Sequence, residues 1–188
     1  MPSIELREAE RRLLFDLARS ALEHPPAPPP VEEERLPEPL TRPAATFVTL
    51  KMQEQLRGCI GTLEAHRPLA RDVAHNAWAA AFRDPRFPPL EREKAAAVRI
   101  ALSVLGPAQP LEVENEPQLL RTLRPGVDGL ILSCGAQRAT FLPAVWQDLP
   151  DPADFVAALG RKAGLSPHHG FGDLAFWRYT VLEWEEGA

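Results

Sequence analysis

Two alternating stretches separated by three residues constrain the fold of this chain more than any other feature of its sequence. From Thr46 to Met52, apolar side chains alternate with others, so Val48, Leu50 and Met52 share one face. The stretch from Leu56 to Leu63 is suited to pair back along the first. Because parallel strands need a crossover of roughly a dozen residues or more, so short a connection predicts an antiparallel hairpin.

The remaining elements extend this pattern. Residues 98–104 alternate as a half-buried strand, residues 130–134 and 138–142 form a second hairpin around Gly135, and residues 176–184 form the last strand. Helices are expected from Ser3 up to Pro25, and over residues 68–83, 115–123 and 151–164, with Ser3, Asn115 and Asp151 as N-terminal caps. About six strands, mainly in hairpins, with four or five helices between them predict an α+β fold whose sheet is mainly antiparallel.

Proline makes up 21 of the 188 residues, about twice its usual share. Residues 25–43 are rich in proline and glutamate, and Pro25–Pro30 favours an extended polyproline conformation. We interpret this segment as a stiff connector within a single domain of residues 1–188, with a ligand for a proline-recognition domain as the alternative. The acidic residues 32–34 are expected on a solvated face.

Charge and cysteine content exclude several classes of function. The net charge is −5 and the basic residues are scattered, whereas nucleic-acid binding favours a concentrated basic stripe. Two cysteines without a C-x-x-C motif give neither a disulfide framework nor a zinc site, and His168 and His169 lack companion ligands. No apolar run approaches the roughly 20 residues that span a bilayer, and the N-terminus lacks a signal core. We expect a cytoplasmic protein with no metal, cofactor, nucleic-acid partner or membrane segment.

The second arm of the first hairpin is the candidate functional site. It places Gly58, Cys59 and Gly61 inside what otherwise reads as a strand. Interior glycines weaken a strand, so they usually mark a bulge, a bend or the close approach of another group to the backbone. In regular extended geometry Leu56, Gly58 and Ile60 lie on one face, with Arg57, Cys59 and Gly61 on the other.

Cys59 is the candidate nucleophile of this strand. Arg57 lies two residues away, about 6.6 Å between Cα atoms, and its guanidinium would favour the thiolate over the thiol. A cysteine nucleophile also needs a base, and the nearest histidines are His66 and, on the following helix, His75. The alternative is that Cys59 is a small buried apolar residue, since free cysteines are among the most buried types.

The segment after the second helix supplies further polar candidates. Arg83–Pro89 reads as a rigid loop, and Arg83, Asp84 and Arg86 would form the rim of a binding site. Asp72 and Asn76 fall on the same side of the preceding helix as Arg83. They could line a cleft with Arg86, or they could form a solvated helix face.

An ordered series of motifs resembles the AMMECR family. The series comprises Leu56–Leu63, Asn76–Ala81 running into Asp84–Leu90, Arg124–Leu130, Ala139–Pro143 and Arg161–Leu165. The resemblance extends from about Glu5 to Glu183 and is to the prokaryotic stand-alone form, whose relatives are often encoded beside a Memo-like protein and a radical-SAM protein. The motif here ends in Thr62-Leu63, where phenylalanine is common in relatives, and the exchange keeps an apolar position.

The resemblance implies an α+β fold of a larger and a smaller lobe, the smaller spanning about residues 64–125, with Arg57–Gly61 near the cleft between them. It implies no settled activity. Two hypotheses follow: a thiol-dependent enzyme that acts through Cys59 on a small molecule or modified group, and a non-catalytic partner of Memo-like and radical-SAM proteins that uses the same surface.

Overall fold

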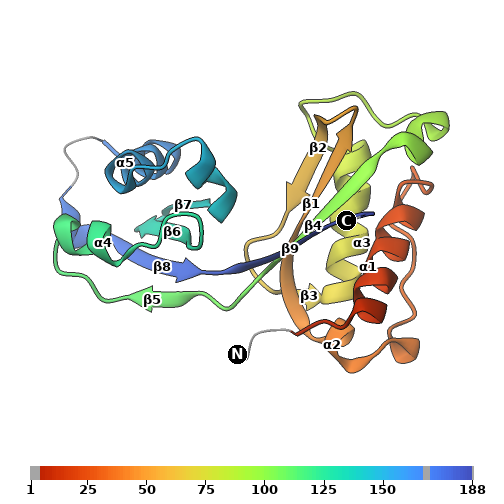
Figure 1. Ribbon diagram of the computed structural model, residues 1–188, viewed down its shortest axis with the longest axis horizontal. Coiled ribbons are helices and arrows are strands. Elements are labelled where there is room, and N and C mark those ends of the chain that lie inside the picture. The colour runs from red at the N-terminus through yellow and green to blue at the C-terminus, as the bar shows by residue number, and fades with distance from the viewer. Residues whose placement is uncertain (1–4, 167–169, 188) are drawn as a thin grey trace. The chain divides into compact units, whose positions relative to one another are not determined.

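The computed structural model describes residues 5–166 and 170–187, which form an α+β structure with two antiparallel sheets (Figure 1). The contacts among these residues divide the chain into two compact units. One consists of Pro2–Leu105 with Leu182–Ala188, and the other of Gly106–Val181. We call them the α3 unit and the α5 unit after their central helices. The expected smaller lobe of residues 64–125 does not coincide with this division, because residues 64–105 belong to the α3 unit.

The sheet of the α3 unit is built on the predicted hairpin. Strand β1 (Pro43–Met52) pairs with β2 (Gln55–Gly61) on one side and with β4 (Arg99–Leu105) on the other. The order is β2-β1-β4-β9, where β9 is Val181–Glu185, and the short β3 (Arg67–Pro68) pairs with β1. Gln53 and Glu54 form the turn with φ values of 51° and 61°. Positive φ at both central residues matches the right-handed twist of the flanking strands.

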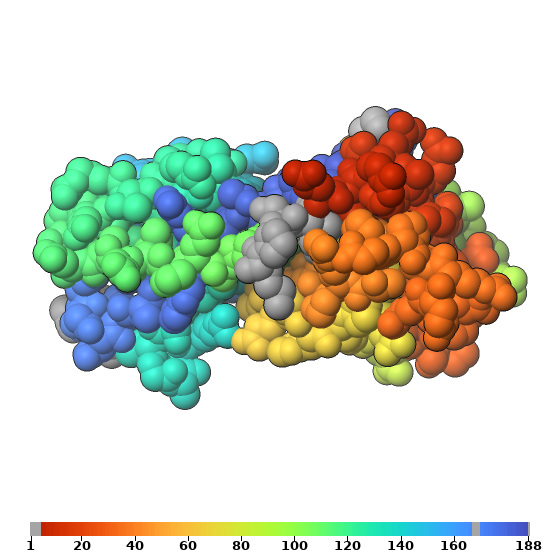
Figure 2. Space-filling view, turned by 90° about the horizontal axis from the view of Figure 1, so that it is seen from below, coloured from red at the N-terminus to blue at the C-terminus, as the bar shows by residue number. Residues whose placement is uncertain are grey.

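Two helices cover one face of this sheet (Figure 1). Helix α1 (Glu8–Ala21) and helix α3 (Leu69–Phe82) pack together, and their buried apolar residues form one core with Val48, Leu50 and Ile100 of the strands. Arg7 occupies the N-cap position of α1, where its amide donates to the Glu10 carboxylate at 2.7 Å, and the expected cap Ser3 lies outside the described residues. The connector lies on the surface of this unit (Figure 2, orange) and contains two turns that the sequence did not predict, η1 (Glu33–Arg35) and α2 (Glu38–Thr41). A further turn, η2 (Arg92–Ala97), precedes β4.

The α5 unit has its own sheet and core. Its strands are β5 (Gln109–Leu111), β8 (Ala175–Tyr179), β6 (Gly129–Cys134) and β7 (Gln137–Phe141), in that order. Helices α4 (Glu116–Thr122) and α5 (Pro152–Lys162) accompany it, with the turns η3 (Pro143–Gln147) and η4 (Phe171–Asp173). The core centres on the buried Phe155, whose ring stacks on Trp146 at 3.7 Å. The predicted caps are confirmed, because Asn115 accepts from the amide of Gln118, and Asp151 from those of Ala153 and Asp154.

The predicted last strand, residues 176–184, is wrong as a single element. It is two strands in different sheets, since β8 pairs with β6 and β9 extends the β4 edge. The change occurs at Thr180, whose carbonyl accepts a hydrogen bond from the amide of Gly106 at 2.8 Å. The run of aromatic and β-branched residues signals extended backbone throughout, but it carries no information about the change of partner.

In the described part of the chain, no helix is long and apolar enough to cross a membrane.

Gly58 sets the contact between β2 and α3. A Cβ atom at this position would lie 2.2 Å from the carbonyl oxygen of Ala80. The predicted close approach at an interior glycine is therefore made by the backbone of the helix. Since the obstacle is backbone rather than a flexible side chain, any larger residue would separate the strand from the helix.

We predict that Gly58→Ala lowers the free energy of unfolding by about 1–3 kcal/mol, through overpacking against Ala80. The matched control is Gly160→Ala in α5, where an added Cβ meets nothing within 4 Å. That change should raise stability by about 0.4–1 kcal/mol, because alanine is favoured within helices. Chemical denaturation of both variants measures the difference, and an unchanged Gly58→Ala midpoint would contradict the role assigned to the contact.

Candidate functional site

A β-bulge at Arg57 changes which side chains share a face. Gly58 pairs with Leu50 and Leu56 pairs with Lys51, so Arg57 is the extra residue of β2. Opposed residues of an antiparallel pair point to the same side. Leu56 therefore lies on the face of Lys51, where its side chain is 44% exposed, and not with Gly58 and Ile60 as regular alternation predicted. The prediction that the interior Gly58 marks a bulge is confirmed, and the bulge lies at the residue before it.

Cys59 points away from α3. Its neighbour Gly58 faces the helix, so strand alternation directs Cys59 to the opposite face of the sheet. There it pairs with Thr49, whose hydroxyl donates to the Cys59 Sγ at 3.3 Å. The ring of Phe47 lies over the adjacent Gly61, where a Cβ would be 2.3 Å away. The thiol is free and partly exposed, so it is not the fully buried apolar residue of the alternative interpretation.

Asp84 ties the loop after α3 to the Cys59 backbone. Its carboxylate, with only 1% of the side chain exposed, accepts from the amide of Cys59 at 2.9 Å. It also accepts from the amide of Arg86 at 3.1 Å and from the Arg86 guanidinium at 2.9 and 2.7 Å. The Arg86 hydrogen bonds, followed by those from the two amides, hold the pKa of Asp84 far below its ordinary value, although burial opposes them. Asp84 thus stays ionised and fixes the loop on the strand.

Arg86, rather than Arg57, is the cation beside Cys59. Its Nη2 donates to the Cys59 carbonyl at 3.1 Å. Asp84 is the main cause that raises the pKa of Arg86, and interaction with Cys59 adds a smaller contribution in the same direction. The Arg57 guanidinium donates instead to the Pro88 carbonyl at 2.6 Å. Both guanidinium groups approach the Phe87 ring, at 5.7 Å from Arg57 and 5.5 Å from Arg86.

Two of the predicted site residues, Arg83 and His75, do not lie beside Cys59. Arg83 ends α3 with its guanidinium 5.3 Å from the Trp78 ring. His75 belongs to α3, on the other side of the sheet from the Cys59 thiol, and lines a separate cavity of about 310 Å³ with Arg67, Arg71 and residues 28–31. Burial, followed by the charge of Arg67, lowers the pKa of His75. The structure therefore brings Arg57, Gly58, Cys59, Asp84 and Arg86 together without His75.

Asp72 and Asn76 form a buried network, and neither of their predicted roles is correct. The Asp72 carboxylate accepts from the amide and hydroxyl of Thr46, at 3.0 and 2.7 Å. It also accepts from Thr62 at 2.7 Å, from Asn76 at 3.0 Å and from the Arg67 guanidinium at 2.8 and 3.0 Å. The sequence signal for this network was a pair of polar residues four positions apart on an otherwise apolar helix. No local feature of the sequence identified Thr46 as their partner.

Among the described residues, no group of three histidine, cysteine or acidic side chains could hold a metal ion. The pair His168-His169 lies outside those residues.

Comparisons with known proteins show which family this chain resembles in sequence and in fold. A family model described as AMMECR1 matches residues 15–184. A protein of Methanothermobacter thermautotrophicus is 38% identical over 165 residues, 86% of each chain. Protein MJ0810 of Methanocaldococcus jannaschii is 34% identical over 173 residues, 90% of this chain and 86% of that protein. The crystal structure of uncharacterized protein PH0010 from Pyrococcus horikoshii superposes with a TM-score of 0.84 at 30% identity, covering 97% of this chain and 94% of that one.

We predict that Asp84→Asn lowers the free energy of unfolding at pH 7 by roughly 2–3 kcal/mol. This is less than the loss for a fully buried ion pair, because the Arg86 side chain is 53% exposed. The pKa of Asp84 is depressed by folding, so its stabilisation is complete above about pH 5 and is lost progressively as the pH falls below that value. Denaturation of the wild type and the variant from pH 7 to pH 3 should show the two stabilities converging.

A matched control is Asp128→Asn in the α5 unit. Asp128 is also fully buried and paired with an arginine whose side chain is 53% exposed, Arg124. Both variants should lose stability, but only Asp84→Asn should accelerate hydrogen exchange at the Cys59 amide. Equal protection of that amide in the two variants would contradict the role of Asp84.

Proposed function

The chain belongs to the AMMECR1 family, and we propose that it is an enzyme whose Cys59 thiol is the nucleophile in a reaction on a small molecule or a modified group. The observation that supports this proposal most is the hydrogen bond from the Thr49 hydroxyl to the Cys59 Sγ, at 3.3 Å. A donor directed at sulfur favours the thiolate, which is the nucleophilic form of cysteine. The partly exposed position leaves the sulfur accessible to a substrate.

The charge beside the thiol supports the same reaction. Arg86 is held beside Cys59 through the Cys59 carbonyl, and its interaction with Cys59 is one of the smaller causes that raise the pKa of Arg86. Asp84 balances much of this positive charge, so the effect of Arg86 on the sulfur is smaller than that of an unpaired guanidinium. The Thr49 hydroxyl and Arg86 are therefore the polar groups that would assist a reaction at Cys59, because His75, the histidine considered as its base, lines a separate cavity.

The surroundings also favour a class of substrate. The Cys59 amide is already bonded to Asp84, so negative charge that develops beside the sulfur must be stabilised by other donors. Arg86 and Arg57, which both approach the Phe87 ring, are the nearby groups with that capacity. We therefore infer a substrate that carries an electrophilic carbon and an anionic group, positioned by Arg86 and Arg57.

We predict that Cys59 is alkylated by iodoacetamide about tenfold faster than Cys134 at pH 7, a factor that corresponds to about 1.4 kcal/mol in activation free energy. Cys134 is a matched control in the same chain, because it also forms no disulfide within the described residues and is also partly exposed. Thr49→Val should slow the alkylation of Cys59 severalfold by removing the hydroxyl donor.

Ser103→Ala should leave that rate unchanged, since the Ser103 hydroxyl on the same face donates to Glu183. Mass spectrometry of tryptic peptides over time follows both thiols in each variant. Equal rates for Cys59 and Cys134, or a Thr49→Val variant that reacts like the wild type, would refute the proposal.

A second candidate function is a docking surface for a protein partner. Leu56 is exposed, and the neighbouring Phe87–Pro89 segment is fixed by Asp84 and by the Arg57 hydrogen bond to Pro88. Arginine and aromatic side chains on a preorganised surface are favourable for protein binding, because little conformational entropy is lost on association. The Memo-like and radical-SAM proteins suggested by the family resemblance are the partners to test.

We predict that Leu56→Glu abolishes co-purification with a Memo-like or radical-SAM partner encoded in the same genome. Val127→Glu provides the control, because Val127 is a similarly exposed apolar residue, at 46% against 44% for Leu56, in the α5 unit. Titration calorimetry with purified partners then measures the affinity. The docking function is rejected if the wild type binds neither partner at micromolar concentrations, and the alkylation result for Cys59 is unaffected by that outcome.

A further inference from the structure

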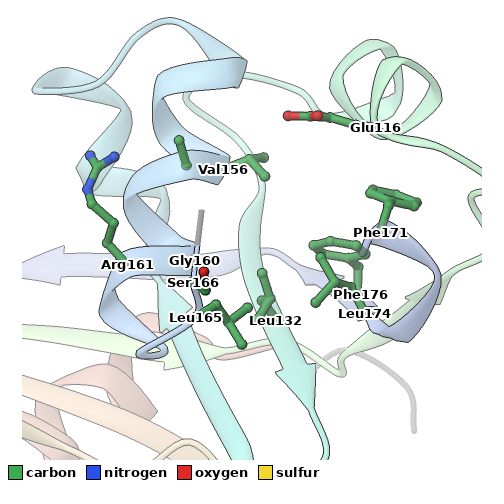
Figure 3. A pocket seen from close by; sticks show the side chains of 11 residues that line it. Glu116, Leu132, Val156, Gly160, Arg161, Leu165, Ser166, Phe171, Leu174 and Phe176 are labelled. Atoms are coloured by element: carbon green, nitrogen blue, oxygen red, sulfur yellow. The ribbon is translucent and has the colours of Figure 1, made fainter. Parts of the chain in front are cut away.

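The α5 unit contains a cavity of about 290 Å³ that the proposed thiol function does not use. Its lining residues come mainly from α5, β6, η4 and β8, as Figure 3 shows. The apolar side chains that define it are Leu132, Val156, Leu165, Phe171, Leu174 and Phe176. All lining residues lie within 116–176 of the described chain, so the cavity belongs to this unit alone.

We propose that this cavity binds a small molecule with a planar apolar body and a cationic group. Phe171 and Phe176 form one wall, with ring centroids 5.5 Å apart and planes inclined by 27°. Val156 and Gly160 face them from α5, and Leu132 lies between the two walls (Figure 3). A stacked pair of aromatic rings opposite aliphatic side chains suits a flat ring system. An apolar cavity of about 150 Å³ holds benzene, so this one has room for about two fused rings.

Gly160 keeps the cavity open. A glycine within a helix is about 1 kcal/mol less favourable than alanine, so its presence requires a reason. Other glycines of this unit have one: a Cβ at Gly129 would lie 2.4 Å from the Tyr179 ring, and Gly164 has a φ of +76°. At Gly160 an added Cβ would meet nothing within 4 Å, and its φ is not in the left-handed region. Neither packing nor backbone conformation requires glycine here, whereas space for a ligand does.

Glu116 determines the charge of the ligand. It is exposed at the start of α4, and its side chain extends toward α5 above the apolar walls in Figure 3. Within the described part of the chain, its carboxylate makes no ion pair or hydrogen bond. The other charged lining residue, Arg161, directs its guanidinium away from the remaining side chains of the cavity (Figure 3). Among the described lining residues, the charge directed at a bound molecule is therefore negative, which favours a cation.

The test uses two planar probes of similar size and opposite charge, 1-naphthylmethylamine and 1-naphthylacetate. NMR titration of the full chain should show the amine shifting the methyl signals of Leu132 and Val156, with a dissociation constant at least fivefold lower than that of the acid. Gly160→Leu should weaken amine binding more than tenfold, because the new side chain occupies the space that Gly160 leaves open. Glu116→Gln should remove the preference for the amine while leaving the binding of the apolar body.

Two controls accompany the Gly160→Leu variant. Gly160→Leu should melt no lower than the wild type, since nothing lies within 4 Å of the new Cβ, and Gly160→Ala, with a smaller intrusion, should weaken binding less. The proposal is overturned if the amine leaves the Leu132 and Val156 methyl signals unmoved at millimolar concentration. It is also overturned if Gly160→Leu is folded and binds like the wild type, or if the preference for the amine survives Glu116→Gln.

Discussion

The carboxylate of Asp84 is the interaction on which the candidate site depends. It accepts the Cys59 amide from β2 and three hydrogen bonds from Arg86, and so joins an edge strand to the loop that follows α3. Without this carboxylate the Cys59 amide and the Arg86 guanidinium would have no common partner. Since the carboxylate is buried and its pKa is held far below the ordinary value, the junction persists throughout the neutral pH range.

Asp72 performs the same task at the other end of α3. It lies in the first turn of the helix and accepts the Thr46 amide from β1 and the guanidinium of Arg67. Each carboxylate therefore receives one strand amide and one arginine, and the helix is attached to the hairpin at both ends. Between these attachments, the absence of a side chain at Gly58 lets β2 contact the Ala80 backbone. The three contacts fix the orientation of β2 and direct Cys59 to the face away from α3.

Local signals were predictable from the sequence, and partners distant in the chain were not. The first hairpin and the caps at Asn115 and Asp151 depend on residues a few positions apart, and the structure confirms them. The bulge at Arg57 accompanies contacts of β2 with Pro88 and Ala80, more than 20 residues away, which regular alternation does not take into account, and so Leu56 was misplaced. The glycines did indicate the bulge in β2 and the close approach of the α3 backbone. Arg86 was expected at the rim of the site, but its hydrogen bond to the Cys59 carbonyl and that of Thr49 to the Cys59 sulfur were not predicted, because they join β2 to a paired strand and a returning loop.

The hydrogen bond between Asp84 and the Cys59 amide also limits the chemistry of the thiol. Many nucleophiles on a backbone turn use their own amide to stabilise negative charge in the transition state. Here that amide is occupied by a carboxylate, which would repel an oxyanion at the same place. Stabilisation must then come from a cationic side chain, and Arg86 is held beside the Cys59 carbonyl by the same carboxylate. Asp84 thus occupies the Cys59 amide and also holds Arg86, the group that would replace that amide as a donor. A reaction at Cys59 would therefore depend on the Asp84–Arg86 pair as a unit.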